Sequence, residues 1–146
     1  MSKNIEPITD LICELSRNCT LKEEYFATSF NLTPTEVRLL KLFTESPTHS
    51  IKELCTQLMV TPGRITHILD SLEKKKLISR SNDPSDKRSI LVKLMPNANP
   101  FIKNLQNNYR VLHEKILNTV DEKDLEKILS SLKVLVNVFR KWSNQK

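Results

Sequence analysis

Two short stretches of this sequence hold the side chains best suited to chemistry. The first is TPGRITH at residues 61–67, and the second is DPSDKR at residues 83–88. The planar guanidinium of Arg64 can donate two hydrogen bonds to O6 and N7 of guanine. Lys87 and Arg88 are cations of the kind that a narrow minor groove attracts. Both stretches favour binding to a polyanion such as nucleic acid.

Residues able to catalyse a reaction show no comparable grouping. No nucleophile–base pair and no constellation of carboxylates stands out. His49, His67 and His113 are too scattered to form a metal site. The only glycine is Gly63, whereas a phosphate-cradling loop or a dinucleotide-binding turn needs several. We therefore expect a protein that is not an enzyme and that carries neither a cofactor nor a metal.

Helix starts are marked by short polar side chains followed by proline or glutamate. Thr33-Pro34-Thr35-Glu36 and Ser50-Ile51-Lys52-Glu53 have the pattern of capping boxes, and Thr61-Pro62 supplies a third cap. Asp121 begins a further helix, because acids suit the positive end of the helix dipole. Apolar residues repeat at helical spacing after each start and in two other stretches. The stripes cover residues 8–15, 37–43, 51–58, 65–72, 101–116 and 125–139.

Between residues 77 and 94 the apolar spacing changes from helical to alternating. Leu77 and Ile78 begin one short strand, and Ile90-Leu91-Val92-Lys93-Leu94 forms another with alternate apolar residues on one face. The intervening Asn82-Asp83-Pro84-Ser85 predicts a turn that needs no glycine. Proline presets φ, and Asn and Asp side chains can bond their own backbone. A β-hairpin is the expected structure.

The lengths of the connections between these elements predict the fold. Only Met59-Val60 separates the stripe at 51–58 from the Thr61 cap, and two helices joined so tightly form a helix-turn-helix. A hairpin directly after the second helix makes the unit a winged helix. We predict a mainly α fold with a small β-hairpin wing, in which helices at both ends of the chain flank a winged helix-turn-helix.

The sequence resembles the MarR family of bacterial transcriptional regulators over nearly its whole length. The strongest part is residues 61–94, where a recognition helix exits through LEKKKLISR into the wing motif Asp-Pro-x-Asp-basic-Arg. That motif is matched in place by Asp83, Pro84, Asp86, Lys87 and Arg88. The sequence departs from the family at turns. Glycine is common in relatives where this chain has Met59, Lys76 and Ala98, and a threonine cap is common where it has Met95.

The resemblance implies an obligate homodimer whose N-terminal helix and two C-terminal helices interlock with those of its partner. Residues 33–96 are then the winged helix-turn-helix DNA-binding domain, and residues 1–32 and 97–146 the helical dimerisation region. It also implies a repressor that binds a pseudo-palindromic double-stranded DNA operator and releases it when a small aromatic effector binds. The long stripes ending in Phe139 and Trp142 exceed what a winged helix needs, which favours dimerisation over a monomeric helical cap.

We expect DNA contacts from the supporting helix, the recognition helix and the wing. The recognition helix should enter the major groove with its N-terminus first. Asp86 could pair with Arg88 or brace the turn, and the whole wing could instead be a solvated charged turn. Gly63 could allow close approach to DNA, or be a first-turn glycine of no consequence. Ser50 and Lys52 could position phosphates, or be an ordinary cap and a solvated lysine. The expected set is Ser50, Lys52, Thr61, Gly63, Arg64, Thr66, His67, Asp86, Lys87 and Arg88.

Charge and composition agree with a DNA-binding protein. The 146 residues carry a net charge of +6, and the interval 50–94 contributes nine bases and five acids, or +4 of that total. No apolar run approaches the roughly 20 residues that span a bilayer, and MSKNIEPITD lacks the pattern of a secretory signal. We expect a cytoplasmic protein that does not contact membranes.

Cysteine usage fits a reducing compartment. Cys13, Cys19 and Cys55 form no CxxC pair. Cys13 lies beside the first apolar stripe, where it could sense oxidation or simply fill space, since buried cysteines are usually inert. His113 is expected in a pocket or in the core.

One further class of function stays open at this point. A winged helix can also be used for protein–protein contact. Arg64 and Arg88 discriminate the two, because a DNA-binding surface depends on their charges.

Overall fold

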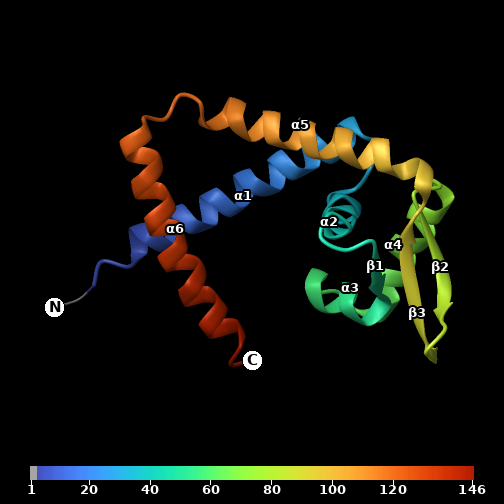
Figure 1. Ribbon diagram of the computed structural model, residues 1–146. Coiled ribbons are helices and arrows are strands. Elements are labelled where there is room, and N and C mark those ends of the chain that lie inside the picture. Colours follow the sequence, from blue (N-terminus) through green and yellow to red (C-terminus); the bar gives the residue numbers. More distant parts are fainter. Residues whose placement is uncertain (1–2) are drawn as a thin grey trace. The chain divides into compact units, whose positions relative to one another are not determined.

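The computed structural model describes residues 3–146, and the chain divides into two compact units, Met1–Asn107 and Asn108–Lys146. The predicted order of helices and hairpin is confirmed, with one additional short strand (Figure 1). The elements are α1 (Glu6–Ser29), α2 (Pro34–Leu42), β1 (Thr48–Ser50), α3 (Ile51–Leu58), α4 (Pro62–Lys74), β2 (Ile78–Asp83), β3 (Asp86–Leu94), the 3-10 turn Pro96–Ala98, α5 (Asn99–Leu117) and α6 (Glu122–Ser143).

The three predicted caps set where α2, α3 and α4 begin. The Thr33 hydroxyl accepts from the backbone N–H of Glu36 at 3.2 Å, and the Glu36 carboxylate accepts from the N–H of Thr33 at 3.3 Å. Ser50 and Glu53 form the same reciprocal box at 3.1 Å for both bonds. Thr61 accepts from the N–H of Arg64 at 3.3 Å. Each cap satisfies a backbone donor that the helix itself cannot use.

Burial of one face of each helix fixes the outward face of α4. Ile65, Ile68, Leu69 and Leu72 are buried, as their spacing predicts. They join a core of fully buried side chains contributed by α2, α3, β3 and the start of α5. That core contains Leu39, Leu40, Leu54, Val92 and Leu105. The remaining residues of the first turns of α4 are therefore directed to solvent.

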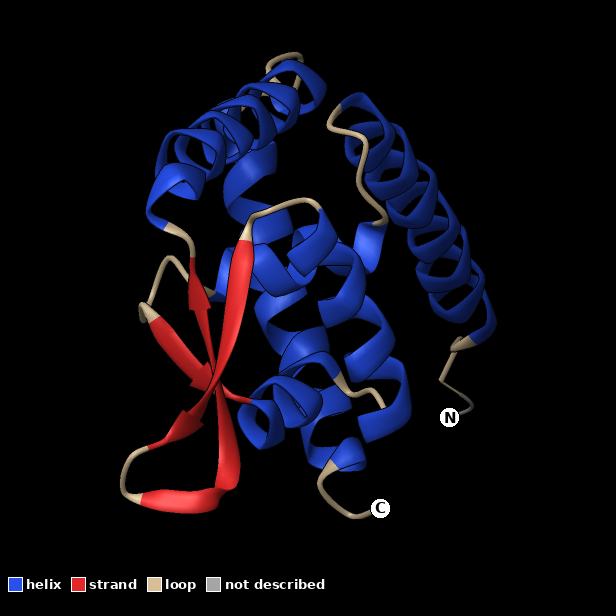
Figure 2. Ribbon diagram, turned by 90° about the vertical axis from the view of Figure 1, so that its right-hand side faces the viewer, coloured by secondary structure: helices blue, strands red, loops and turns tan. Residues whose placement is uncertain are grey.

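The wing belongs to a three-stranded antiparallel sheet with the order β1-β3-β2. The β2–β3 hairpin projects beyond the neighbouring helices, as Figure 2 shows. Strand β1 was not predicted, because three residues are too few to show alternation. Its central residue, His49, lies opposite Val92 and is buried. The ring Nε2 of His49 lies 2.9 Å from the carbonyl oxygen of Leu42. Pairing with β3 thus anchors the residues that precede α3.

The wing tip closes without glycine because its backbone needs no left-handed residue. Positive φ occurs among the described residues only at Asn31, Met59 and Lys76, and all three lie outside the wing. Pro84 and Ser85 form the turn between the strands. The Asp83 carboxylate accepts from the N–H of Ser85 at 2.9 Å and from its hydroxyl at 2.7 Å. The predicted Asp–Pro–Ser turn chemistry is confirmed.

Met59 and Lys76, where the resemblance leads us to expect glycine, both have the left-handed backbone conformation that glycine favours. Met59 has φ 55° and ends α3, and Lys76 has φ 59° just after α4. The N–H of Val60 bonds to the carbonyl of Cys55 at 3.1 Å, and the N–H of Leu77 bonds to that of Leu72 at 3.1 Å. These bonds hold the turns in place. A side chain in the left-handed region costs about 1–2 kcal/mol.

The second unit consists of the end of α5 and the whole of α6. None of the residues of α6 is buried. Its apolar side chains nevertheless repeat at helical spacing, and many are large. Exposed apolar residues include Leu125, Ile128, Leu129, Leu132, Val136, Phe139 and Trp142. The described helices contain none that is long and apolar enough to cross a membrane.

Candidate nucleic-acid interface

The exposed side of α4 carries all the recognition-helix residues predicted to contact DNA. Gly63, Arg64, Thr66 and His67 are exposed, whereas Ile65 points into the core. A Cβ added at Gly63 would meet no heavy atom within 4 Å, so nothing inside the chain requires a glycine there. The outward face of the first turns of α4 is therefore open to a partner.

Helical spacing divides this surface into two flanks. Residues three or four apart lie on one face of a helix. Arg64, His67 and Ser71 therefore lie on one flank, where they line a groove of about 530 Å³ together with residues of α1 and α2. Thr66 and Asp70 lie on the other flank, together with Gly63. The predicted contact residues of α4 are thus spread over both flanks.

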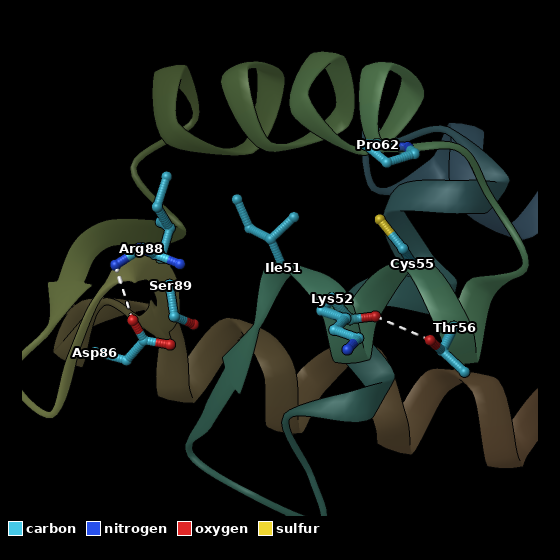
Figure 3. Close-up of a pocket in the computed structure, with 9 residues that line it drawn as sticks. Ile51, Lys52, Cys55, Thr56, Pro62, Asp86, Arg88 and Ser89 are labelled. Carbon is cyan, nitrogen blue, oxygen red and sulfur yellow. Dashed lines mark hydrogen bonds between the residues drawn. The ribbon is translucent and has the colours of Figure 1, made fainter.

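A second groove brings the supporting helix and the wing together. It measures about 490 Å³, and Figure 3 shows the residues around it. Lys52 enters from α3, Pro62 from the start of α4, and Asp86 and Arg88 from β3. Ile51, Cys55 and Ile90 add an apolar lining. Three predicted contact residues from distant parts of the sequence, Lys52, Asp86 and Arg88, therefore surround one groove between α3 and the part of β3 next to the wing tip.

Asp86 acts on the backbone of the wing. Its Oδ1 accepts from the backbone N–H of Arg88 at 3.0 Å. Among residues 3–146 there is no ion pair between the side chains of Asp86 and Arg88. Of the two roles predicted for Asp86, bracing the turn is the one that the structure shows. The guanidinium of Arg88 and the exposed Lys87 remain at the surface.

The hydroxyl groups predicted to touch DNA already have intramolecular partners. The hydroxyls of Ser50 and Thr61 accept the capping bonds of α3 and α4. Each retains its own O–H, which can still donate to a phosphate. The hydroxyl of Thr66 donates to the carbonyl of Pro62 at 3.0 Å. Capping is thus an established role of Ser50 and Thr61, and a DNA contact would be a second one.

A buried carboxylate that the sequence identified only as part of a capping box anchors the far end of α4. Glu36 is only 3% exposed. It accepts from the Ser71 hydroxyl at 2.7 Å and from Nζ of Lys75 at 2.8 Å. Lys75 also donates to the carbonyl of Asn31 at 2.9 Å. The ammonium group of Lys75 is therefore paired with acceptors of the same chain, although its side chain is 32% exposed. The only signal in the sequence was the capping box of Glu36, which explains its backbone bond and not its other partners.

The surroundings of Glu36 keep it ionised. Burial alone raises the pKa of its carboxyl group. The hydrogen bonds from Lys75, Ser71 and the backbone of Thr33, together with the charge of Lys75, more than offset burial, so the pKa lies below its ordinary value of 4.5. A charged carboxylate is the form that accepts all these bonds.

Arg80 of β2 forms a second link to the recognition helix. One of its guanidinium nitrogens, Nη2, lies 2.5 Å from Oδ1 of Asp70 and 2.7 Å from Oε2 of Glu73. The hydrogen bond from Arg80 lowers the pKa of Glu73. The bonds to Glu73 and Asp70 raise the pKa of Arg80. The wing strand is therefore tied to α4 through charge-assisted hydrogen bonds.

The structure also shows the surroundings of His113 and Cys13. Nδ1 of His113 lies 2.7 Å from the carbonyl oxygen of Tyr109, and its ring packs on the Tyr109 ring with centroids 4.2 Å apart. Within the described residues no group of three or more His, Cys, Asp or Glu side chains could hold a metal ion. Cys13 is exposed on α1, so burial within the single chain does not make it inert. Its redox role stays a prediction.

The order of elements, the sheet and the two grooves define a winged helix-turn-helix protein. Comparison with solved structures supports this class. AbsC, a MarR family transcriptional regulator from Streptomyces coelicolor, superimposes with a TM-score of 0.80 at 19% identity, covering 97% of both chains. A mutant of MarR from E. coli, solved in complex with operator DNA, superimposes with a TM-score of 0.75 at 22% identity. That match covers 92% of this chain and 99% of the mutant.

The chain is similar to the MarR family of transcriptional regulators over part of its length. The family model matches residues 32–90, from the end of the α1–α2 connection to β3. A relative named as the uncharacterized HTH-type transcriptional regulator YkoM, from Bacillus subtilis, is 29% identical over 69 residues. That match covers 47% of this chain and 45% of YkoM, so it spans less than half of the relative. These relatives are regulators and not enzymes, as predicted.

Proposed function

We propose that this chain is a repressor that binds a pseudo-palindromic double-stranded DNA operator as a homodimer in the cytoplasm. The single observation that carries the proposal is the groove shared by Lys52 and Arg88 between α3 and the start of β3. It places cations of the supporting helix and the wing beside the N-terminal end of α4. A surface of this kind fits the phosphate backbone on both sides of a major groove.

In this arrangement each element has its own task on DNA. The exposed first turns of α4 enter the major groove, where Arg64 reads a guanine and His67 contacts a base or a phosphate. The wing lies over the adjacent minor groove, whose negative potential attracts Arg88 and Lys87. Lys52 neutralises a phosphate. Asp86 holds the wing backbone at Arg88 in the absence of DNA, so less ordering is needed on binding.

The dimer is supported by apolar surface that the single chain leaves uncovered. Along α6, Leu129 is 56% exposed and Trp142 is 58% exposed. On α1, Leu11 is 64% exposed and Leu15 is 53% exposed. Apolar stripes of this extent on both terminal helices mark an association surface. A two-fold homodimer presents two winged helices and requires an operator with two inverted half-sites.

Repression and its release by a small aromatic effector extend the family resemblance to this chain. A dimer seated on an operator blocks access of other proteins to that DNA. An effector releases DNA when it binds better to a form of the dimer whose two winged helices no longer match the half-site spacing.

Genomic footprinting of the purified protein tests the proposal. We expect protected sites with inverted half-sites whose centres lie about 10 base pairs, or a multiple of that, apart. Sedimentation should show two copies of the chain per site. Aromatic acids and phenols added to the complex should include compounds that release the DNA. Protection of single, unpaired half-sites by a monomer would contradict the dimer.

A further inference from the structure

Two carboxylates lie on a flank of the recognition helix that faces outward. Asp70 follows Thr66 by four residues and Glu73 follows Asp70 by three, so they continue the stripe that begins at Gly63. The side chain of Asp70 is 50% exposed and that of Glu73 is 35% exposed. Negative charges at this place would repel the phosphates of any DNA that the helix approaches. DNA binding by this helix therefore requires that these two charges be offset.

Arg80 is placed to offset the charges of both carboxylates. It pairs with both carboxylates through Nη2, at 2.5 Å and 2.7 Å. Its own side chain is only 24% exposed, so the guanidinium is directed along the protein rather than into solvent. No other cation forms an ion pair with Asp70 or Glu73 within residues 3–146.

The strand that carries Arg80 is held firmly. Arg80 lies opposite Val92 in the antiparallel register of β2 and β3, and Val92 is fully buried. The backbone from which the guanidinium extends is therefore fixed against the core. Partial burial and two charged acceptors make this contact more persistent than an ordinary surface ion pair.

We propose that Arg80 is a positioning residue for DNA binding, which pairs with both Asp70 and Glu73 and so reduces the negative charge that this flank of the recognition helix presents to DNA from two to one. This inference rests on the proposed function. Arg80 acts through the two carboxylates and makes no phosphate contact of its own. Its charge is paired with carboxylates of the same chain, unlike the charges of Arg64 and Arg88.

A thermodynamic cycle on one DNA duplex tests the inference. The probe is a duplex selected from random-sequence DNA by the wild-type protein. Affinity and its salt dependence are measured for wild type, Arg80→Gln, the pair Asp70→Asn with Glu73→Gln, and the triple variant. Lys127→Gln, which removes one exposed cation of α6, is the control for the loss of a charge.

We expect Arg80→Gln to bind about tenfold more weakly, because it exposes two unneutralised carboxylates to the phosphates. The pair variant should bind at least as tightly as wild type. The triple variant should bind like the pair variant, because Arg80 has nothing left to neutralise. Lys127→Gln should leave affinity nearly unchanged.

Other outcomes overturn the inference. If Arg80 contacts a phosphate, the triple variant stays weak and the slope of log K against log salt falls by about 0.9. If Asp70 reads a base, the pair variant loses affinity. If Arg80→Gln does not fold, the comparison of the pair and triple variants still decides the question. Equal binding by Arg80→Gln and wild type overturns this inference alone, whereas a wild type that selects no duplex overturns the proposed function itself.

Discussion

Nζ of Lys75 lies 2.8 Å from Oε2 of Glu36, so the C-terminal end of the recognition helix is fastened to the first turn of α2. Lys75 belongs to a run of three lysines that could be taken for a DNA-binding stretch. Its contact with a buried carboxylate shows that a lysine in a basic run near the recognition helix can have a structural role. The C-terminal end of α4 is therefore held by an ion pair within the fold.

Replacing Glu36 with glutamine should lower the free energy of unfolding by about 1–2 kcal/mol at neutral pH, because Lys75 loses its ionised partner. The pKa of Glu36 is depressed in the folded state. Its contribution is therefore complete above the unfolded value near 4.5 and is lost as the pH falls through the folded value. Denaturant unfolding at several pH values should show wild type and variant converging in acid. A constant difference down to about pH 3 would contradict this account.

Lys41 should make stability rise with pH in alkaline solution. Burial, together with the charge of nearby Lys22, lowers the pKa of Lys41 to about 8, although Glu23 acts in the opposite direction. Between about pH 8 and the unfolded value of 10.5 the unfolded chain binds more protons than the folded chain, so the free energy of unfolding increases with pH. Lys41→Met should remove this increase. Denaturation at about pH 7.5 and about pH 9.5 measures it, and an identical rise in both proteins would refute the assignment.

Met59 should be improved by glycine. Its φ of 55° is left-handed, and its side chain is 85% exposed, so little packing is lost on substitution. We expect Met59→Gly to stabilise the fold by about 0.5–1 kcal/mol, after allowing for the greater freedom of glycine in the unfolded chain. Met59→Ala is the matched control, since it removes the side chain but keeps Cβ. A gain of equal size in both variants would mean that backbone strain is not the cause.

Substitution of Gly63 should affect the stability of the fold and the affinity for DNA differently. Because an added Cβ meets nothing within 4 Å, Gly63→Ala should raise stability by up to about 1 kcal/mol. If DNA approaches this turn closely, the same methyl group should weaken binding. Thermal unfolding and DNA titration of one protein sample measure both effects. Unchanged affinity would favour the alternative that a first-turn glycine has no function.

Local signals were readable from the sequence. The capping boxes of Thr33 and Ser50, the Asp83–Ser85 turn and the apolar face of α4 each depend on residues close together in the chain, and each is confirmed. The exposed terminal stripes were also identified by spacing. At this level the fold could be predicted, and so could the exposure of the predicted contact residues of α4.

Contacts between distant residues could not be predicted in the same way. The bonds that Glu36 receives from Ser71 and Lys75 join residues 35 and 39 positions apart. The periodicity of the sequence does not indicate which carboxylate will pair with which cation. Strand β1 likewise forms only because β3 pairs with it. The left-handed Met59 and Lys76 show that tertiary structure can impose a turn that the local residue disfavours.

The most direct test of DNA recognition is the salt dependence of binding by the variant Arg64→Gln with Arg88→Gln. Its stability should match wild type, because both side chains are exposed. We expect binding to the duplex selected by wild type to be abolished or reduced to weak residual binding, with the slope of log K against log salt smaller by up to about 2. Unchanged affinity and an unchanged slope would show that the winged helix does not bind DNA through this surface.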